Sequence, residues 1–140
     1  MKFLAGVNAD IRGVDSVDDG EGLVEAAKDL ANKYNCTVAA TGEKDVVTDG
    51  ERVAIIENGV EMLTKVTGAG CMLGALCAGT AGACEDKFIA TTAAVVAMGI
   101  SGEMAYEEAK FPGSFRVKLM DAIYQVDEKA IVEKAKIRFI

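Results

Sequence analysis

The sequence predicts an α/β domain, and three patterns support this class. Apolar residues at helical spacing over residues 23–34 precede a short apolar segment at residues 37–40, as expected for a helix that packs on a buried strand. Two further strand patterns flank the turn dipeptide Asp49-Gly50. After residue 68 helical patterns dominate, so we expect a helix-rich second half.

Length, composition and charge narrow the class of protein. The 140 residues suit a single domain, and an apolar content of 51% is enough for a core. The net charge of −7, with scattered basic residues, argues against nucleic-acid binding, which needs a basic face. The longest apolar stretch, residues 93–100, suits a buried helix rather than a bilayer span, so we expect no membrane association.

The cysteines and the absence of histidine exclude several kinds of site. Cys36, Cys71, Cys77 and Cys84 form no C-x-x-C pair, and the chain has no histidine. Mixed Cys/His zinc sites and every Ser-His or Cys-His catalytic pair are therefore excluded. Three of the four cysteines lie in or beside an apolar helix pattern, which favours reduced thiols in a cytoplasmic protein over disulfides.

The first elements are a helix and a strand. Ser16 is a candidate N-cap for the amphipathic helix, and Asn35 is a candidate left-handed stop. The segment 37–40 is apolar on both faces, which predicts a strand in the middle of a parallel sheet covered by helices. Ligands in such sheets lie beyond the carboxyl ends of the strands, where Thr41 follows.

A hairpin and several helices follow along the chain. Strands are expected at residues 45–48, 52–57 and 61–66, and the acidic hairpin residues are expected to be solvated rather than to bind a metal. Helices are expected at residues 69–83, 85–109, 115–124 and 127–134, with Ser114 and Asp127 as caps of the last two. Residues 136–140 predict a closing edge strand.

The run from Thr67 to Gly70 is the strongest candidate for chemistry. It is rich in hydrogen-bond donors and directly precedes an apolar helix pattern, as a glycine-rich loop that opens a helix would. The first turn of a helix has unpaired N–H groups and the positive end of the helix dipole, so this run predicts an anion site, most often for phosphate. The alternative is a tight strand-to-helix turn without a ligand.

Several segments resemble one enzyme family. The run 65–71 followed by an apolar helix is similar to the second signature of the ribokinase-like superfamily, and Cys71, in place of the usual aspartate, resembles hydroxyethylthiazole kinases. Residues 13–16, 41–50 and 111–115 resemble further segments of that family in the same order. The resemblance implies the C-terminal portion of a ribokinase-like three-layer α/β/α sandwich, with residues 1–140 as a single partial domain.

This resemblance also implies an activity. Family members transfer a phosphoryl group from ATP, with Mg²⁺, to the primary hydroxyl of 4-methyl-5-(2-hydroxyethyl)thiazole in thiamine biosynthesis and salvage, and they assemble as homotrimers. By resemblance Thr41 contacts ATP and Gly68 contacts the thiazole. The acidic magnesium residues belong to the half of the family's domain that this sequence does not match, so no metal ligand is assigned within this chain.

The loop residues have specific expected roles. The N–H groups of Gly68, Ala69, Gly70 and Cys71 would form an anion hole for the transferred phosphoryl group. Cys71 stands where relatives place a catalytic aspartate, and its roles are to assist proton removal or to shape the pocket. The alternative for Cys71 is a small buried packing residue.

Two other functions stay open at this point. The first is a catalytically incomplete fragment that binds a nucleotide or a partner chain without turnover. The second is another ribokinase-like kinase, such as one for hydroxymethylpyrimidine, although Cys71 and the segment 41–50 argue against it.

Overall fold

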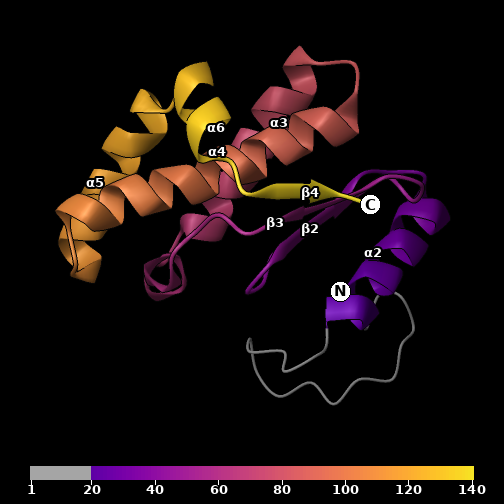
Figure 1. Cartoon of the computed structure of the whole chain (residues 1–140), viewed down its shortest axis with the longest axis horizontal. Coiled ribbons are helices and arrows are strands. Elements are labelled where there is room, and N and C mark those ends of the chain that lie inside the picture. Colours follow the sequence, from indigo (N-terminus) through magenta and orange to yellow (C-terminus); the bar gives the residue numbers. More distant parts are fainter. Residues whose placement is uncertain (1–19) are drawn as a thin grey trace.

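A computed structural model describes residues 20–140, which form a four-stranded sheet with helices on both faces (Figure 1). The elements in chain order are α2 (Gly20–Tyr34), β1 (Val38–Ala40), β2 (Asp45–Thr48), β3 (Val53–Ile56), η1 (Glu61–Lys65), α3 (Ala69–Ala83), α4 (Lys87–Glu108), α5 (Pro112–Gln125), α6 (Glu128–Lys134) and β4 (Ile137–Phe139). The predicted α/β class and the helix-rich second half are confirmed.

Alternating strand residues build the layers. Val46, Val53 and Ile55 pack with Ala27 of α2 on one face of the sheet. Val47, Ala54 and Ile56 pack on the other face against Phe88, Val95 and Ile100 of α4. The period of two along each strand therefore produces a helix–sheet–helix sandwich, as predicted.

The pairing of β1 differs from the prediction. In residues 20–140, β1 pairs only with β2, in antiparallel direction, so it is an edge strand rather than the middle of a parallel sheet. The four residues between the two strands explain this, because a connection this short makes a hairpin, whereas parallel strands need a long crossover. The hairpin of β2 and β3 and the closing strand β4 are confirmed.

The strand predicted at residues 61–66 is wrong. These residues form the 3-10 helix η1, which local contacts stabilise: Leu63 N–H donates to Val60 O at 3.0 Å and Thr64 Oγ1 donates to Glu61 O at 2.8 Å. Met62 and Leu63 pack against the core below α4 and α5. The segment pairs with no strand of the described sheet, and its local hydrogen bonds close a helical turn instead.

The helix caps agree with the sequence except at α4 and α5. Asp127 accepts from Ala130 N–H at 2.8 Å, as predicted, and Asp86, expected within the start of its helix, is the N-cap that accepts from Ile89 N–H at 3.1 Å. Asn35 has a φ of 49°, which confirms it as the left-handed stop of α2. The cap predicted at Ser16 lies outside the described residues.

Ser114 is not the N-cap of α5. The helix begins two residues earlier at Pro112, after the extended residue Phe111, and Ser114 Oγ donates back to Phe111 O at 3.1 Å. Proline fits the first turn because its fixed φ suits a helix and its missing N–H would have no intrahelical partner there.

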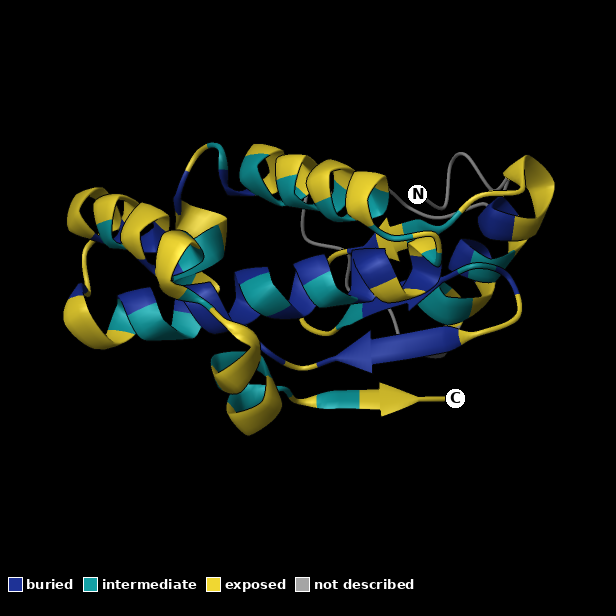
Figure 2. Ribbon diagram, turned by 90° about the horizontal axis from the view of Figure 1, so that it is seen from above, coloured by how far each residue is buried: buried dark blue, intermediate teal, exposed yellow. Residues whose placement is uncertain are grey.

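The helix α4 is the centre of the fold. It packs on the sheet and is also in contact with α3, α5 and α6, and most of its surface is buried (Figure 2). By length and composition it is apolar enough to cross a membrane, contrary to the expectation from the sequence. Because 72% of its most apolar window is buried inside the fold, it has the character of a core helix.

Two glycines let the segment before α3 approach α4. A Cβ atom on Gly99 would lie 2.7 Å from Asn58 Cβ and 2.8 Å from Asn58 O, and one on Gly102 would lie 2.8 Å from Leu63 Cδ1. Asn58 is fixed further, since its Nδ2 donates to Lys134 O at 2.9 Å and its Oδ1 accepts from Lys136 N–H at 2.7 Å. These contacts fix the segment between β3 and α3 against α4.

We predict that Gly99→Ala destabilises the protein by about 1–3 kcal/mol, because the added methyl group meets backbone atoms of Asn58 that cannot move aside. Gly79→Ala is the matched control in α3, where a Cβ meets nothing within 4 Å. It should stabilise the chain by about 0.5–1 kcal/mol, since glycine disfavours helix interiors. Urea unfolding measures both, and equal stability of Gly99→Ala and wild type would contradict the close approach.

Candidate active site

The backbone at Gly68 sets the entry to α3. Gly68 is the N-cap residue, with φ 99° and ψ −6°, a left-handed conformation that residues with a Cβ rarely adopt. Its carbonyl accepts from Met72 N–H at 2.9 Å, which is the first regular bond of the helix. The chain therefore turns sharply at Gly68, and the helix begins at the next residue, as the sequence predicts.

The first turn of α3 leaves amide groups free. Within residues 20–140, no acceptor takes the N–H of Gly70 or Cys71, and no side chain caps the helix. The first turn of α3 also has no acidic residue, whereas Asp86 and Asp127 cap α4 and α6. The positive end of the helix dipole at this point thus faces no carboxylate of its own first turn, which is the condition for anion binding.

One of the four residues of the predicted anion hole, Ala69, already has a hydrogen-bond acceptor for its N–H group. Ala69 is buried in the core below α4, and its N–H donates to Val66 O at a long 3.4 Å. Gly70 and Cys71 are exposed and Gly68 is half-buried. The four predicted residues lie together, but Ala69 anchors the turn while the N–H groups of Gly70 and Cys71 stay accessible.

The cysteines at α3 differ in exposure. The side chain of Cys71 is free and exposed in the described structure. Cys77 and Cys84 are half-buried, and Cys77 packs towards the core beneath α4. Burial raises the pKa of the Cys77 thiol above its usual value, which keeps that thiol protonated.

Thr41 lies at the end of the sheet where the segment from β3 to Gly68 begins. β1 and β3 are both antiparallel to β2, so they run in the same direction and their carboxyl ends meet at one edge. Thr41 follows β1 there and is exposed, while β3 leads at the same edge into η1 and then Gly68 (Figure 1). Lys44 Nζ lies 2.6 Å from Glu57 Oε1 and links the two strand ends.

Asp45 differs from its predicted role as a solvated hairpin charge. Its side chain is half-buried beside Thr41, and its Oδ1 accepts from Gly42 N–H at 3.0 Å. Burial raises the pKa of Asp45 from 3.8 to about 6, and the hydrogen bond from Gly42 opposes this only in part. The sequence shows the hairpin but not this burial, which the packing around the strand ends creates.

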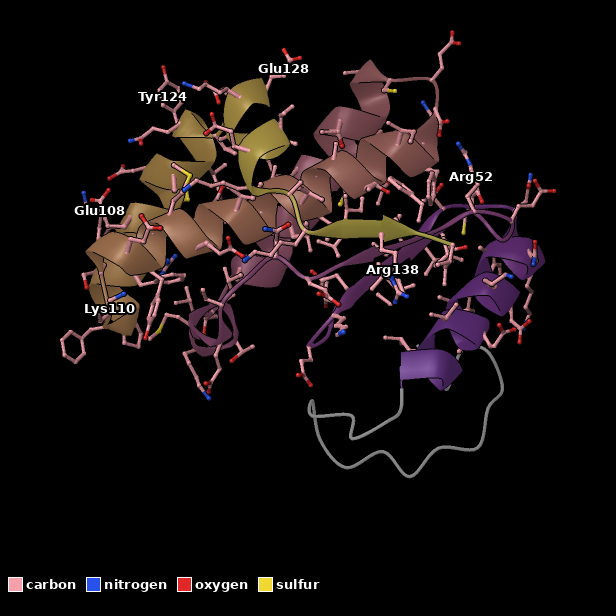
Figure 3. The ribbon with its side chains drawn as sticks, viewed as in Figure 1. Arg52, Glu108, Lys110, Tyr124, Glu128 and Arg138 are labelled. Carbon is pink, nitrogen blue, oxygen red and sulfur yellow. The ribbon has the colours of Figure 1, made fainter. Side chains whose placement is uncertain are left out.

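Arg52 and Lys65 are two basic residues that could contact phosphates. In the structure both form ion pairs with carboxylates instead. Arg52 Nη1 lies 2.6 Å from Asp86 Oδ2, its Nη2 lies 2.7 Å from Asp49 Oδ2, and its guanidinium stacks on the Phe88 ring. This group sits at the hairpin end of the sheet (Figure 3), beside a hollow of about 400 Å³. The hydrogen bond from Arg52 lowers the pKa of Asp86 to about 2.

The other basic candidate forms a local pair. Lys65 Nζ lies 3.1 Å from Glu61 Oε1 within η1. It borders a second hollow, of about 280 Å³, with Val60, Met62 and Tyr106. Neither of these two hollows is lined by Gly68 or Cys71, and Gly70 and Cys71 are exposed.

The donor set for a metal is not assembled in the described part of the chain. Among residues 20–140, no three Asp, Glu or Cys side chains gather closely enough to hold a metal ion. The chain therefore offers backbone donors for an anion at α3 and no described ligand set for a cation.

Comparison with known proteins identifies the family. The model of the hydroxyethylthiazole kinase family matches residues 1–129. The chain belongs to the hydroxyethylthiazole kinase family. It is 58% identical over 139 residues to "Hydroxyethylthiazole kinase 1" of Clostridium botulinum strain Hall, which spans 99% of this chain, and 57% identical over 137 residues to the hydroxyethylthiazole kinase of Clostridium kluyveri, which spans 98%.

The same family appears among solved structures. The hydroxyethylthiazole kinase protein from Pyrococcus horikoshii OT3 superposes with a TM-score of 0.83 at 44% identity and covers 86% of this chain. The chain spans about half the length of these relatives: 53% and 51% of the two clostridial proteins and 47% of the Pyrococcus chain. Each of these three relatives is thus about twice as long as this chain.

We predict that Asp45 makes the free energy of unfolding of this family member depend on pH. Because burial raises its folded pKa from 3.8 to about 6, the contribution is fully present below pH 3.8 and is lost as the pH rises through about 6. The loss is at most about 3 kcal/mol, from 1.36 kcal/mol per pKa unit. Asp45→Asn keeps an acceptor for Gly42 and removes the titration, so the stability difference from wild type should change between pH 4 and pH 7. A constant difference would contradict the shifted pKa.

Proposed function

We propose that this chain supplies the phosphoryl-transfer half of a hydroxyethylthiazole kinase. The reaction moves the γ-phosphoryl group of ATP to the primary hydroxyl of 4-methyl-5-(2-hydroxyethyl)thiazole, a step of thiamine biosynthesis and salvage. The observation that carries this proposal is the pair of accessible, uncapped N–H groups of Gly70 and Cys71 at the start of α3, in a chain that belongs to this kinase family.

Phosphoryl transfer depends mainly on positioning and on stabilisation of negative charge. Backbone N–H groups at a helix start suit this task, since they are fixed before the reaction and need no reorganisation. The amides of Gly70 and Cys71 would donate to oxygens of the transferred group, with Gly68 beside the thiazole. Ala69 contributes by holding the turn in the core rather than by donating, because its N–H already bonds Val66 O.

Thr41 would contact ATP from the neighbouring strand end. Its exposed position at the common edge of β1 and β3 supports this role, because ligands of open α/β sheets bind beyond the carboxyl ends of strands. Asp45 fixes the backbone of Gly42 directly after Thr41. We assign Asp45 a positioning role at this edge.

Cys71 would assist the reaction without being indispensable. It projects from the same first turn as the free amides and is exposed to whatever occupies the site. A thiol there can shape the pocket and help to orient the substrate hydroxyl. The larger share of the stabilisation would come from the amides, which a substitution of the side chain leaves in place.

Other properties of the complete enzyme are part of the same proposal. Mg²⁺ would arrive with the nucleotide and be held by groups outside the described residues, which gather no ligand set of their own. The working assembly would be a homotrimer in the cytoplasm, where the four cysteines, all free in the described structure, remain reduced.

A second candidate function is a nucleotide-binding or partner-binding chain without turnover. The absence of a described metal-ligand set in residues 20–140 favours it for this polypeptide by itself. An ATP-dependent phosphorylation assay with hydroxyethylthiazole separates the two, run with the chain alone and with the segment of the Clostridium botulinum kinase that this chain does not match. Product only in the mixture supports the proposal, and no product in either contradicts it.

We predict that Cys71→Ser in the active mixture keeps kcat/KM within about tenfold, whereas Gly70→Pro lowers it by about 10²–10³-fold, the usual cost of one lost oxyanion donor. Gly70→Ala is the matched control, because it retains the N–H and adds a Cβ into open space. Proline is tolerated in a first helical turn, and circular dichroism checks that α3 forms. Complete loss in Cys71→Ser with full activity in Gly70→Pro would reverse the assignment.

A further inference from the structure

Glu103 is a partly buried carboxylate on α4 that bonds to groups outside its own helix. Its Oε1 accepts from Gly59 N–H at 3.0 Å, from Lys136 Nζ at 3.0 Å and from Asn58 Nδ2 at 3.3 Å. Its side chain is only 18% exposed. Burial opposes its ionisation, but the hydrogen bonds from Gly59, Lys136 and Asn58 outweigh burial and lower the pKa of Glu103, so the carboxylate is charged at neutral pH.

The bond from Gly59 lies at the start of the segment that leads to the candidate active site. Gly59 stands between β3 and η1 and has a φ of 134°, a conformation that residues with a Cβ rarely adopt. A charged acceptor forms one of the stronger hydrogen bonds found in proteins. Glu103 therefore holds this unusual turn from α4, whereas Asn58 ties it to the residues before β4.

Apolar packing continues from this turn to the first turn of α3. One cluster with residues of α4 and α5 contains Val60, Leu63, Val66 and Ala69. Apolar contacts are not directional, so they hold the segment against α4 without fixing its place along that helix. Within the described structure, the hydrogen bonds that join residues 57–68 to α4 end at Glu103, and these directional bonds fix that place.

We propose that Glu103 is a positioning residue for phosphoryl transfer, which acts through Gly59 and η1 and fixes where the first turn of α3 presents the amides of Gly70 and Cys71. The inference rests on the proposed function of those amides and adds the residue that holds them in place. Glu103 acts through the backbone and not on the reacting groups. Such placement matters because a displacement of about 1 Å can lower a reaction rate by about 10²-fold.

The bond to Gly59, rather than the ion pair with Lys136, carries this role. The Lys136 side chain is 59% exposed, and ion pairs at exposed positions contribute little to stability. The backbone N–H of Lys136 bonds Asn58 Oδ1, and this bond does not need the side chain. Lys136→Ala therefore removes the ion pair alone and is the matched control for variants of Glu103.

Ligand-free ¹H–¹⁵N correlation spectra of the 140-residue chain test the positioning itself. Glu103→Ala should shift the amide signals of Gly70 and Cys71. Glu103→Asp should do the same, because its shorter side chain withdraws the carboxylate from Gly59, and this milder change decides the test if Glu103→Ala does not fold. Glu103→Gln should keep the wild-type signals, since its Oε1 still accepts from Gly59, and so should Lys136→Ala. Unmoved signals of Gly70 and Cys71 in the folded Ala and Asp variants would overturn the inference.

Titration of the same variants with inorganic tripolyphosphate separates this inference from the proposed function. The Kd should rise about tenfold in Glu103→Ala and stay within about twofold in Glu103→Gln and Lys136→Ala. Val53→Ala, which removes buried methyl groups on the α2 face of the sheet, controls for lost stability and should bind as the wild type does. An equal loss of affinity in Glu103→Ala and Val53→Ala would overturn the positioning role. If the wild type does not bind tripolyphosphate, the proposed function fails, while shifted amides in Glu103→Ala would still support the positioning by Glu103.

Discussion

The close packing of the segment between β3 and α3 on two glycines of α4 is the constraint on which the structure depends. Gly99 and Gly102 have no side chains, so Asn58 and Leu63 lie directly against the helix backbone. Asn58 also binds both ends of the turn before β4, which ties the closing strand to the same point. One buried helix therefore fixes the sheet, η1 and the approach to α3 together.

The candidate site follows from this arrangement. With η1 held against α4, Ala69 enters the core and its amide bonds Val66, so the chain must turn at Gly68 in a left-handed conformation. The next two amides, of Gly70 and Cys71, then have no acceptors among the described residues, and both residues are exposed. The free donors thus follow from the core packing of Ala69, and donors that are positioned before the reaction are effective towards a phosphoryl group.

Local patterns allowed most elements to be predicted, and the failures have both local and non-local causes. The glycine-rich entry to α3, the cap Asp127 and the stop at Asn35 depend on neighbours in sequence, and all were predicted. The strand expected at residues 61–66 became η1, β1 became an edge strand in antiparallel pairing, and Asp45 became half-buried. The fate of residues 61–66 and the burial of Asp45 depend on how separate segments pack, which the local pattern does not show. The pairing of β1 follows instead from the short connection to β2, a local signal that favours a hairpin.

The central claim is that the amides at the start of α3 hold a phosphoryl group. Its most direct test is a titration of the ¹⁵N-labelled chain with inorganic tripolyphosphate, followed by ¹H–¹⁵N correlation spectra. The largest shift changes should occur at the amides of Gly70 and Cys71, with a smaller response at Ala69, whose N–H is already bonded. Shift changes confined to the hollow around Arg52 and Lys87, with Gly70 and Cys71 unmoved, would contradict the claim.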